Sequence, residues 1–308
     1  MKAIFMGTPD FSVPALEKLC EVHDVLAVVT QPDKPKGRSG KLAACAVKER
    51  AVELGKKVIQ PERARDGAFI EELRSLEPDV IVVIAYGQIL PGEILELPKY
   101  GCVNVHASLL PKYRGAAPIQ WAVINGDKVT GVTTMLMNEG LDTGDILLTR
   151  EINTDAKETG GSLFDKLSAV GAELMLETLE GLEKSEIIPV KQDESQATKV
   201  GLLTKSMGEL DFNRHAEELE RLIRGLDPWP GAFTFAEGKK LSIWKADVAE
   251  GNGEPGIVAG VGKDHIDIGC GEGILRVTEL QAEGKRRMSA RDYLNGTVLK
   301  SGDKLGKG

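Results

Sequence analysis

The sequence predicts an α/β protein whose first part is an open, doubly wound parallel sheet and whose second part is a small antiparallel β-barrel. In the first half, short apolar runs without polar alternation take turns with helical patterns, as in parallel sheets covered on both faces. Near the C-terminus, short strand-like runs are separated by glycine turns instead. The length of 308 residues exceeds what one core usually occupies, which favours two domains.

The elements of the first domain follow from its apolar runs and its helix signals. Ser12 is expected to cap the first helix, with Pro14 in its first turn, and Gly55 is expected to close the second. The expected strands are residues 2–7, 24–31, 57–61 and 79–90, with a further pair within residues 131–152. Residues 102–121 are expected to begin as a buried strand and to run into a loop of prolines, a glycine and positive charge. The expected helices are residues 10–22, 47–55, 68–78 and 159–184. The first turn, "MGTPDFS", lacks the glycine fingerprint of a dinucleotide site.

A polar stretch near residues 190–207 predicts a linker, so the expected domains are residues 1–189 and 208–308. Beyond the linker, one helix over residues 215–226 precedes the short strands, which lie between residues 232 and 280. Strands of this length and spacing are typical of small OB-like barrels. The predicted order is therefore a Rossmann-like domain followed by an OB-like domain.

Composition excludes several classes of protein. Hydrophobic residues make up 42% of the chain, the mean hydropathy is -0.15, and no apolar run approaches the ~20 residues of a membrane span. The N-terminus shows neither a secretory nor a transit pattern, so a cytoplasmic protein without membrane contact is expected. Four scattered cysteines without zinc or redox spacing predict buried thiols, with no disulfide and no metal site.

The net charge of -8 argues against bulk attraction of nucleic acid. However, residues 31–50 carry six basic and two acidic side chains, and residues 284–307 carry seven basic and two acidic ones. Residues 206–308 as a whole are slightly acidic, with 15 basic and 17 acidic side chains. Two local basic segments on an acidic body predict contact with a polyanion at chosen places, although solvated surface charge would give the same pattern.

The stretch "CVNVHASLLPKYRGAAPIQW", residues 102–121, places two polar side chains in a buried strand. Because side chains alternate across a strand, Asn104 and His106 project from one face, and Val103 and Val105 from the other. An amide can donate to a developing oxyanion and a histidine can move a proton, so the pair suits acyl-type transfer. A satisfied polar pair at a strand end is the alternative.

An aspartate is expected to accompany the histidine. Asp142 lies in a loop framed by Gly140 and Gly144, where its charge would orient a histidine and favour its charged form. Asp145 is the other candidate, but it precedes an apolar run, which favours a capping role. No nucleophile elbow is present and Cys102 begins a strand, so direct transfer is favoured over a covalent intermediate.

Longer motifs resemble the folate-dependent formyltransferases along nearly the whole chain. "NVHASLLPKYRGAAPIQWAVINGD" and "GVTTMLMNEGLDTGDIL" carry the strongest resemblance. "FMGTPDFSVPALEKL" resembles the family's opening, "TQPDKPKGRSGK" its inserted loop, and "DVIVVIAYGQILP" its folate-lining strand. "IRGLDPWPGAFT" resembles the entry to the C-terminal barrel of the members that act on charged tRNA.

The resemblance implies that Asn104, His106 and Asp142 are catalytic and that 10-formyltetrahydrofolate is the formyl donor. It also implies that three short segments bind the folate. Their residues are Tyr86, Gly87, Gln88, Ile89, Leu90, Asn138, Glu139, Gly140, Ser108, Leu109, Leu110 and Pro111. An apolar slot beside a glycine at a strand end would suit a pterin, although Tyr86 and Leu90 could equally be core residues.

The same resemblance implies that initiator methionyl-tRNA, through its α-amine, accepts the formyl group and that the protein is a monomer. The basic residues expected to contact the tRNA are Lys34, Lys36, Arg38, Lys41, Lys285, Arg286 and Arg287. Arg38 is expected to act from a mobile arm that closes over the acceptor end, because a guanidinium can grip phosphate or stack on a base.

Two alternatives stay open from the sequence. Relatives that formylate amino sugar nucleotides have similar N-terminal motifs, and these motifs do not identify the amine. A non-enzymatic alternative is a folate-sensing RNA-binding protein, with the barrel as the reader of RNA. A radiolabelled formyl donor offered to charged tRNA or to amino sugar nucleotides distinguishes the three.

Overall fold

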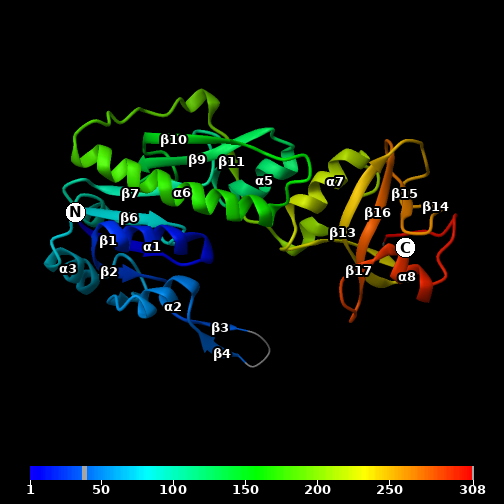
Figure 1. The fold of residues 1–308 in the computed structure, drawn as a ribbon, viewed down its shortest axis with the longest axis horizontal. Helices are drawn as coiled ribbons and strands as arrows, with labels where there is room; N and C mark the ends of the chain where they lie inside the picture. The colour runs from blue at the N-terminus through cyan, green and yellow to red at the C-terminus, as the bar shows by residue number, and fades with distance from the viewer. Residues whose placement is uncertain (37–39, 307–308) are drawn as a thin grey trace. The chain divides into compact units, whose positions relative to one another are not determined.

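The computed structural model describes residues 1–36 and 40–306, which fold into two compact units (Figure 1). Unit 1 consists of Met1–Gly115, Val129–Ile152 and Phe164–Val200. Unit 2 consists of Ala116–Lys128, Asn153–Leu163 and the chain from Gly201 onward. Two short segments of the predicted first domain therefore belong to unit 2, and the first part of the predicted linker belongs to unit 1. Within the described residues, no helix has the length and hydropathy that a membrane span requires.

A seven-stranded sheet forms the centre of unit 1, in the order β10-β9-β7-β6-β1-β2-β5. Its strands are β1 (Lys2–Gly7), β2 (Asp24–Val29), β5 (Val58–Ile59), β6 (Val80–Ile84), β7 (Cys102–His106), β9 (Val129–Leu136) and β10 (Asp145–Asn153). The pairs from β7 to β5 are parallel, whereas β9 is antiparallel to β7. The order reverses at β1, which pairs with β6 on one side and β2 on the other. The doubly wound sheet is confirmed, and ligands of such sheets bind beyond the carboxyl ends of the strands.

Helices cover both faces of this sheet. They are α1 (Val13–Val22), α2 (Ala46–Glu53), α3 (Gly67–Ser75), α4 (Gly92–Leu95) and α6 (Gly160–Glu183), with short 3-10 helices η1 (Asp10–Ser12) and η2 (Glu194–Gln196). On one face, apolar residues of α3 and α4 join a buried core with Cys102. On the other, α6 packs closely on β7, because a Cβ added to Gly171 would lie 3.1 Å from Val105. Alternate residues of β7 therefore face opposite helices.

Ser12 does not cap α1 as the sequence predicted. Ser12 precedes the first residue of α1, but its backbone is already helical and its hydroxyl oxygen accepts no capping hydrogen bond from the first turn. The hydroxyl instead donates to the carbonyl oxygen of Ile84 at 2.8 Å, in a fully buried position. Ser12 thus satisfies an acceptor at the carboxyl end of β6, which joins the start of α1 to the sheet.

Replacing Ser12 by alanine should lower the free energy of unfolding by about 1–3 kcal/mol, because the Ile84 carbonyl would lose a buried donor. Chemical denaturation measures this change. Ser75→Ala is the matched control, since the Ser75 hydroxyl donates to Glu72 at an exposed helix end. Equal midpoints for the two variants would contradict the role assigned to Ser12.

The basic segment after β2 is more structured at its base than a loop. β3 (Lys34–Lys36) and β4 (Lys41–Ala43) pair antiparallel there. Just before them, the carboxylate of Asp33 accepts hydrogen bonds from Lys48 at 2.7 Å and from Gln60 at 2.9 Å. These contacts tie the foot of the hairpin to α2 and to the segment after β5.

Unit 2 is built around a six-stranded antiparallel sheet in the order β12-β13-β16-β15-β14, with β17 also pairing with β16. Its strands are β12 (Ala232–Ala236), β13 (Lys239–Ala249), β14 (Val258–Val261), β15 (Ile266–Gly269), β16 (Ile274–Ala282) and β17 (Met288–Ser289). Its helices are α5 (Pro118–Asn125), η3 (Lys205–Gly208), α7 (Ala216–Gly225) and α8 (Ala290–Gly296). The predicted second, antiparallel domain is confirmed.

Helix α5 falls where the sequence predicted a loop. Pro118 occupies its first position, where proline is well tolerated because that N–H has no helical partner. Ile124 of α5 belongs to the buried core of unit 2, together with Leu219 and Leu222 of α7. The two helices approach so closely that a Cβ added to Gly225 would lie 2.4 Å from the Ile124 side chain.

Candidate active site

The three predicted catalytic residues come together at one edge of the sheet in unit 1. Asn104 and His106 are on β7, and Asp142 is in the loop between β9 and β10. Because Val105 faces α6, Asn104 and His106 lie on the opposite face, toward the carboxyl end of the strand. This edge is where a doubly wound sheet binds its ligands.

His106 is held by the backbone of the loop that follows its strand. Its Nε2 lies 2.9 Å from the carbonyl oxygen of Tyr113, and its side chain is buried. A carbonyl only accepts hydrogen bonds, so Nε2 carries the proton and Nδ1 is the basic nitrogen of the neutral ring. The ring is therefore fixed through one nitrogen while the other keeps its lone pair.

Asp142 faces this free nitrogen without bonding to it. Its Oδ1 is 3.9 Å from His106 Nδ1, beyond hydrogen-bonding distance, while its Oδ2 accepts from the Gly115 N–H at 2.7 Å. In this structure the Tyr113 carbonyl, rather than Asp142, orients the histidine by a hydrogen bond. The carboxylate supplies negative charge beside the nitrogen that would take up a proton. Asp145, the other candidate, is the first residue of β10.

Asn104 has a polar atom without a partner. Its Oδ1 is buried, and none of the described residues donates a hydrogen bond to it. An unpartnered buried acceptor costs about 1–3 kcal/mol and is rare in folded proteins. A bound substrate that carries an N–H would complete the hydrogen bonding of this amide.

The thiol of Cys102 cannot serve as a nucleophile in this environment. Cys102 is 1% exposed, and burial raises the pKa of its thiol to about 12, so the thiolate is not formed near neutral pH. This burial agrees with direct transfer. Among the residues that the structure describes, no three His, Cys, Asp or Glu side chains gather closely enough to hold a metal ion.

The segment Ser108–Pro111, expected to bind folate, forms a tight loop joined to β9. The Thr133 hydroxyl donates to the Ser108 carbonyl at 2.7 Å and accepts from the Leu110 N–H at 3.0 Å. The Ser108 hydroxyl is buried and donates to the Lys112 carbonyl at 2.7 Å. Leu110 is also buried, whereas Leu109 and Pro111 are partly accessible. The side chains of Ser108 and Leu110 therefore serve the loop itself.

The segment from Tyr86 to Leu90 mixes buried and exposed side chains. Tyr86 and Leu90 are buried in the core beneath α3 and α4, and burial raises the pKa of Tyr86 to about 12. The Tyr86 carbonyl accepts from Thr8 at 3.1 Å and from Gln31 at 3.2 Å. Ile89, which lies between Tyr86 and Leu90 in the sequence, is 80% exposed. The backbone and Ile89 are thus the parts of this segment that remain near solvent, while Gln88 accepts from the Ala64 N–H.

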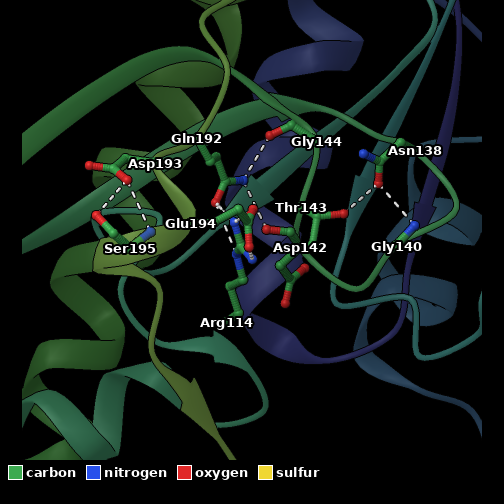
Figure 2. A network of polar contacts seen from close by, with 10 residues as sticks. All are labelled: Arg114, Asn138, Gly140, Asp142, Thr143, Gly144, Gln192, Asp193, Glu194 and Ser195. Carbon is green, nitrogen blue, oxygen red and sulfur yellow. Dashed lines mark hydrogen bonds and ion pairs between the residues drawn. The ribbon is translucent and has the colours of Figure 1, made fainter.

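The third expected folate segment, 138–140, is an exposed turn. The Asn138 side-chain oxygen accepts from the Gly140 N–H at 2.9 Å and from the Thr143 hydroxyl at 2.8 Å, as Figure 2 shows. Glu139 is exposed beside them. The turn brings Leu141, which is 65% exposed, next to Asp142.

The basic residues predicted to contact tRNA have different surroundings. Lys34, Lys285 and Arg286 are exposed. Arg38 lies outside the described residues, as do the side chains of Lys36 and Lys41. Arg287 pairs with Glu279, lies 3.5 Å from Asp227 Oδ2, and sits 4.9 Å from the centre of the Trp244 ring. Arg287 is therefore committed to contacts within unit 2.

Sequence reasoning missed a polar network that contacts the backbone of Asp142 (Figure 2). Arg114 is 2% exposed, and its guanidinium donates to Gln192 at 2.7 and 3.0 Å and to Glu194 at 2.7 and 2.9 Å. Gln192 in turn donates to the backbone carbonyls of Asp142 at 2.9 Å and Gly144 at 2.7 Å. A lone arginine after tyrosine looks like surface charge, so one sequence holds no signal for this burial.

The Arg114–Glu194 pair predicts a pH-dependent contribution to stability. Hydrogen bonds from Arg114 lower the pKa of Glu194 below its ordinary value of 4.5. Because the folded pKa is depressed, the contribution is present above pH 4.5 and is lost as pH falls through the lowered value. Glu194→Gln should therefore melt below the parent at neutral pH, and the two melting temperatures should converge in acid. An identical gap for the exposed Glu186→Gln control would contradict this.

Comparisons with known proteins agree with this geometry. A formyl transferase model matches residues 1–179, and a model of the formyl transferase C-terminal domain matches residues 202–298. The chain belongs to the formyl transferase family. Both domains of the family are present in order, and the catalytic candidates lie in the first.

Full-length relatives of this formyl transferase are known. It is 59% identical to the methionyl-tRNA formyltransferase of Lachnospira eligens, over 100% of both chains. It is 54% identical to that of Caldanaerobacter subterraneus subsp. tengcongensis, over 97% of this chain and 100% of the relative. A crystal structure of an N-formyltransferase from Helicobacter canadensis, with folinic acid and dTDP-3-aminofucose, shares the fold with a TM-score of 0.68 at 18% identity, covering 90% of this chain and 98% of that one.

Proposed function

We propose that this enzyme transfers the formyl group of 10-formyltetrahydrofolate to the α-amine of methionyl-initiator tRNA, without a covalent enzyme intermediate. The observation that carries the proposal is the buried His106, whose Nδ1 is left free beside the Asp142 carboxylate. Such a base suits an attacking amine that must lose a proton. The acceptor follows from the full-length relatives, which are methionyl-tRNA formyltransferases.

The three side chains have distinct roles in the proposed reaction. The amine nitrogen attacks the formyl carbon, and the Asn104 amide stabilises the oxyanion that forms on the formyl oxygen. The Asn104 Oδ1 accepts from the amine N–H, which supplies the missing partner. His106 Nδ1 removes a proton from the amine, and the Asp142 carboxylate stabilises the resulting imidazolium. The carbon–nitrogen bond to the folate then breaks, and the proton passes to the departing folate nitrogen.

Exposed apolar side chains support a folate site at the same edge. Ile89 is 80% exposed and Leu141 is 65% exposed. Ile89 belongs to one segment expected to line the pterin pocket, and Leu141 directly follows another, residues 138–140. Their exposed apolar side chains are available to contact the pterin ring of a folate, since ligand pockets are lined mainly by apolar side chains. A folate-bound formyltransferase of the same fold supports a folate donor, and the 10-formyl form supplies the group to be transferred.

The proposed tRNA contacts are the two local basic segments rather than the body of unit 2, which is slightly acidic. Lys34, Lys36, Arg38 and Lys41 form the first group, and the exposed Lys285 and Arg286 begin the second. Binding through a few phosphate contacts should weaken as salt rises, because each contact releases counterions. We further propose that the enzyme is a monomer and acts in the cytoplasm.

A formyl-transfer assay tests the proposal directly. Radiolabelled 10-formyltetrahydrofolate is incubated with the enzyme and either charged initiator tRNA or amino sugar nucleotides. Label is expected on the methionyl-tRNA alone. Label on the sugar alone would assign the other acceptor, and folate-dependent binding of tRNA without labelled product would replace the enzyme by an RNA-binding protein.

A further inference from the structure

The segment Gln192–Thr198 hydrogen-bonds to the backbone of Asp142 and of Tyr113, the residue whose carbonyl orients His106. These hydrogen bonds involve neither the His106 imidazole nor the Asp142 carboxylate. It includes η2 and leads into β11 (Lys199–Val200), which pairs with β8 (Arg114–Gly115). The sequence predicted this segment to be part of a linker. Its contacts show that it is instead built into the active-site edge of unit 1.

The buried Arg114 locks the side chain of Gln192. A buried guanidinium is costly unless its donors are satisfied, and here Gln192 and Glu194 accept four hydrogen bonds from it. Because the guanidinium only donates, the Gln192 oxygen must face it. The amide nitrogen of Gln192 must then face the other way, toward the loop that carries Asp142 (Figure 2).

The loop needs this support. Asp142 has a φ of +52°, a left-handed conformation that costs a side-chain-bearing residue about 1–2 kcal/mol. Gly144 packs so tightly that an added Cβ would lie 1.8 Å from the Leu136 carbonyl oxygen. The Gln192 amide bonds the carbonyls on both sides of Thr143 and so holds the loop at the position where Asp142 faces His106.

The same segment also fixes the partner of His106. The Thr198 hydroxyl accepts from the Tyr113 N–H at 2.8 Å, and the Thr198 carbonyl accepts from the Arg114 N–H at 2.9 Å. The Tyr113 carbonyl is the acceptor that orients His106, and Tyr113 is itself left-handed with a φ of +59°. The segment Gln192–Thr198 therefore stabilises both stretches of backbone that determine how His106 and Asp142 face each other, at Tyr113 and at Asp142.

We propose that Gln192 and Thr198 are positioning residues for the formyl transfer, with Gln192 holding the Asp142 loop and Thr198 holding the Tyr113 carbonyl. The inference rests on the proposed function of His106 and Asp142. Neither residue contacts a reacting atom, so their loss should slow the chemical step and leave substrate binding unchanged.

Gln192→Glu is the sharpest test. The carboxylate still accepts from Arg114, which keeps the buried cation satisfied, but it has no N–H for the carbonyls of Asp142 and Gly144. The expected result is a loss of up to about 10²-fold in kcat and in the single-turnover rate, with the KM values for folate and charged tRNA unchanged. Gln196→Glu, an exposed glutamine of the same segment, is the matched control.

Thr198→Val is an independent test, because it removes the hydroxyl that accepts from the Tyr113 N–H. Thr198 is exposed and valine has the same shape, so the variant should keep the fold. A smaller loss of kcat at unchanged KM is expected. Melting temperature and folinic acid binding show that each variant is folded. A kcat equal to that of Gln196→Glu in either folded variant, or a change confined to KM, would overturn the inference. An inactive parent and control would instead contradict the proposed function.

Discussion

His106→Gln is expected to lower kcat by about 10²–10⁴, the usual contribution of a positioned general base. Glutamine can still donate to the Tyr113 carbonyl through its amide nitrogen, so the hydrogen bond between residue 106 and this carbonyl is kept. What it lacks is a basic nitrogen beside Asp142. The variant therefore removes the proton acceptor and leaves the surrounding loop in place.

The pH profile separates a base from a merely structural histidine. In the parent, kcat should fall in acid as protonation removes the base, and this acidic limb should be absent from His106→Gln. The exposed His215, replaced by alanine, is the control and should retain both the rate and the limb. A variant that kept most of the parent kcat, or the same acidic limb, would show that another group moves the proton.

Asn104→Ala is expected to lower kcat by about 10²–10³, as does the loss of one oxyanion donor in other enzymes. Folinic acid binding should be retained, because the expected folate contacts come from other segments. Removing the side chain also removes its unpartnered buried oxygen, so stability need not fall with activity. Single-turnover formylation of charged tRNA and folinic acid titration measure the two effects.

Asn104→Asp completes this test. Aspartate has nearly the same shape but no N–H to donate, so it should lose activity at least as severely as alanine. Asn295→Ala, at an exposed position of α8, should behave as the parent. Turnover near the parent rate in Asn104→Asp would exclude the amide as the oxyanion donor.

The central strands were predictable because each is a short, nearly continuous run of apolar residues. β1, β6 and β7 are covered on both faces, so their continuous apolar runs show in the sequence. The shared face of Asn104 and His106 also follows from the alternation of a strand. Helix α5 was missed, because Pro118 indicates either a loop or a first helical position and only tertiary packing decides between them.

The surroundings of the catalytic residues were less predictable, since they depend on contacts between distant segments. β8 and β11 are two residues each and are separated by more than eighty positions, so neither has a periodicity to detect. The hydrogen bond from His106 to the Tyr113 carbonyl involves backbone, which any residue offers. Arg114, Gln192 and Glu194 are common surface types, and only the fold shows that they form one network.

The close fit of α5 and α7 has a consequence for recombination between relatives. The chain crosses from one unit to the other several times, so a single crossover near residue 201 would not exchange an intact domain. The recipient would keep its own α5 and receive a foreign α7, and Gly225 leaves no room for a larger residue opposite Ile124. A chimera that preserves this contact would have to inherit residues 116–128 and 153–163 from the same parent as the chain from Gly201 onward, because these segments form one unit.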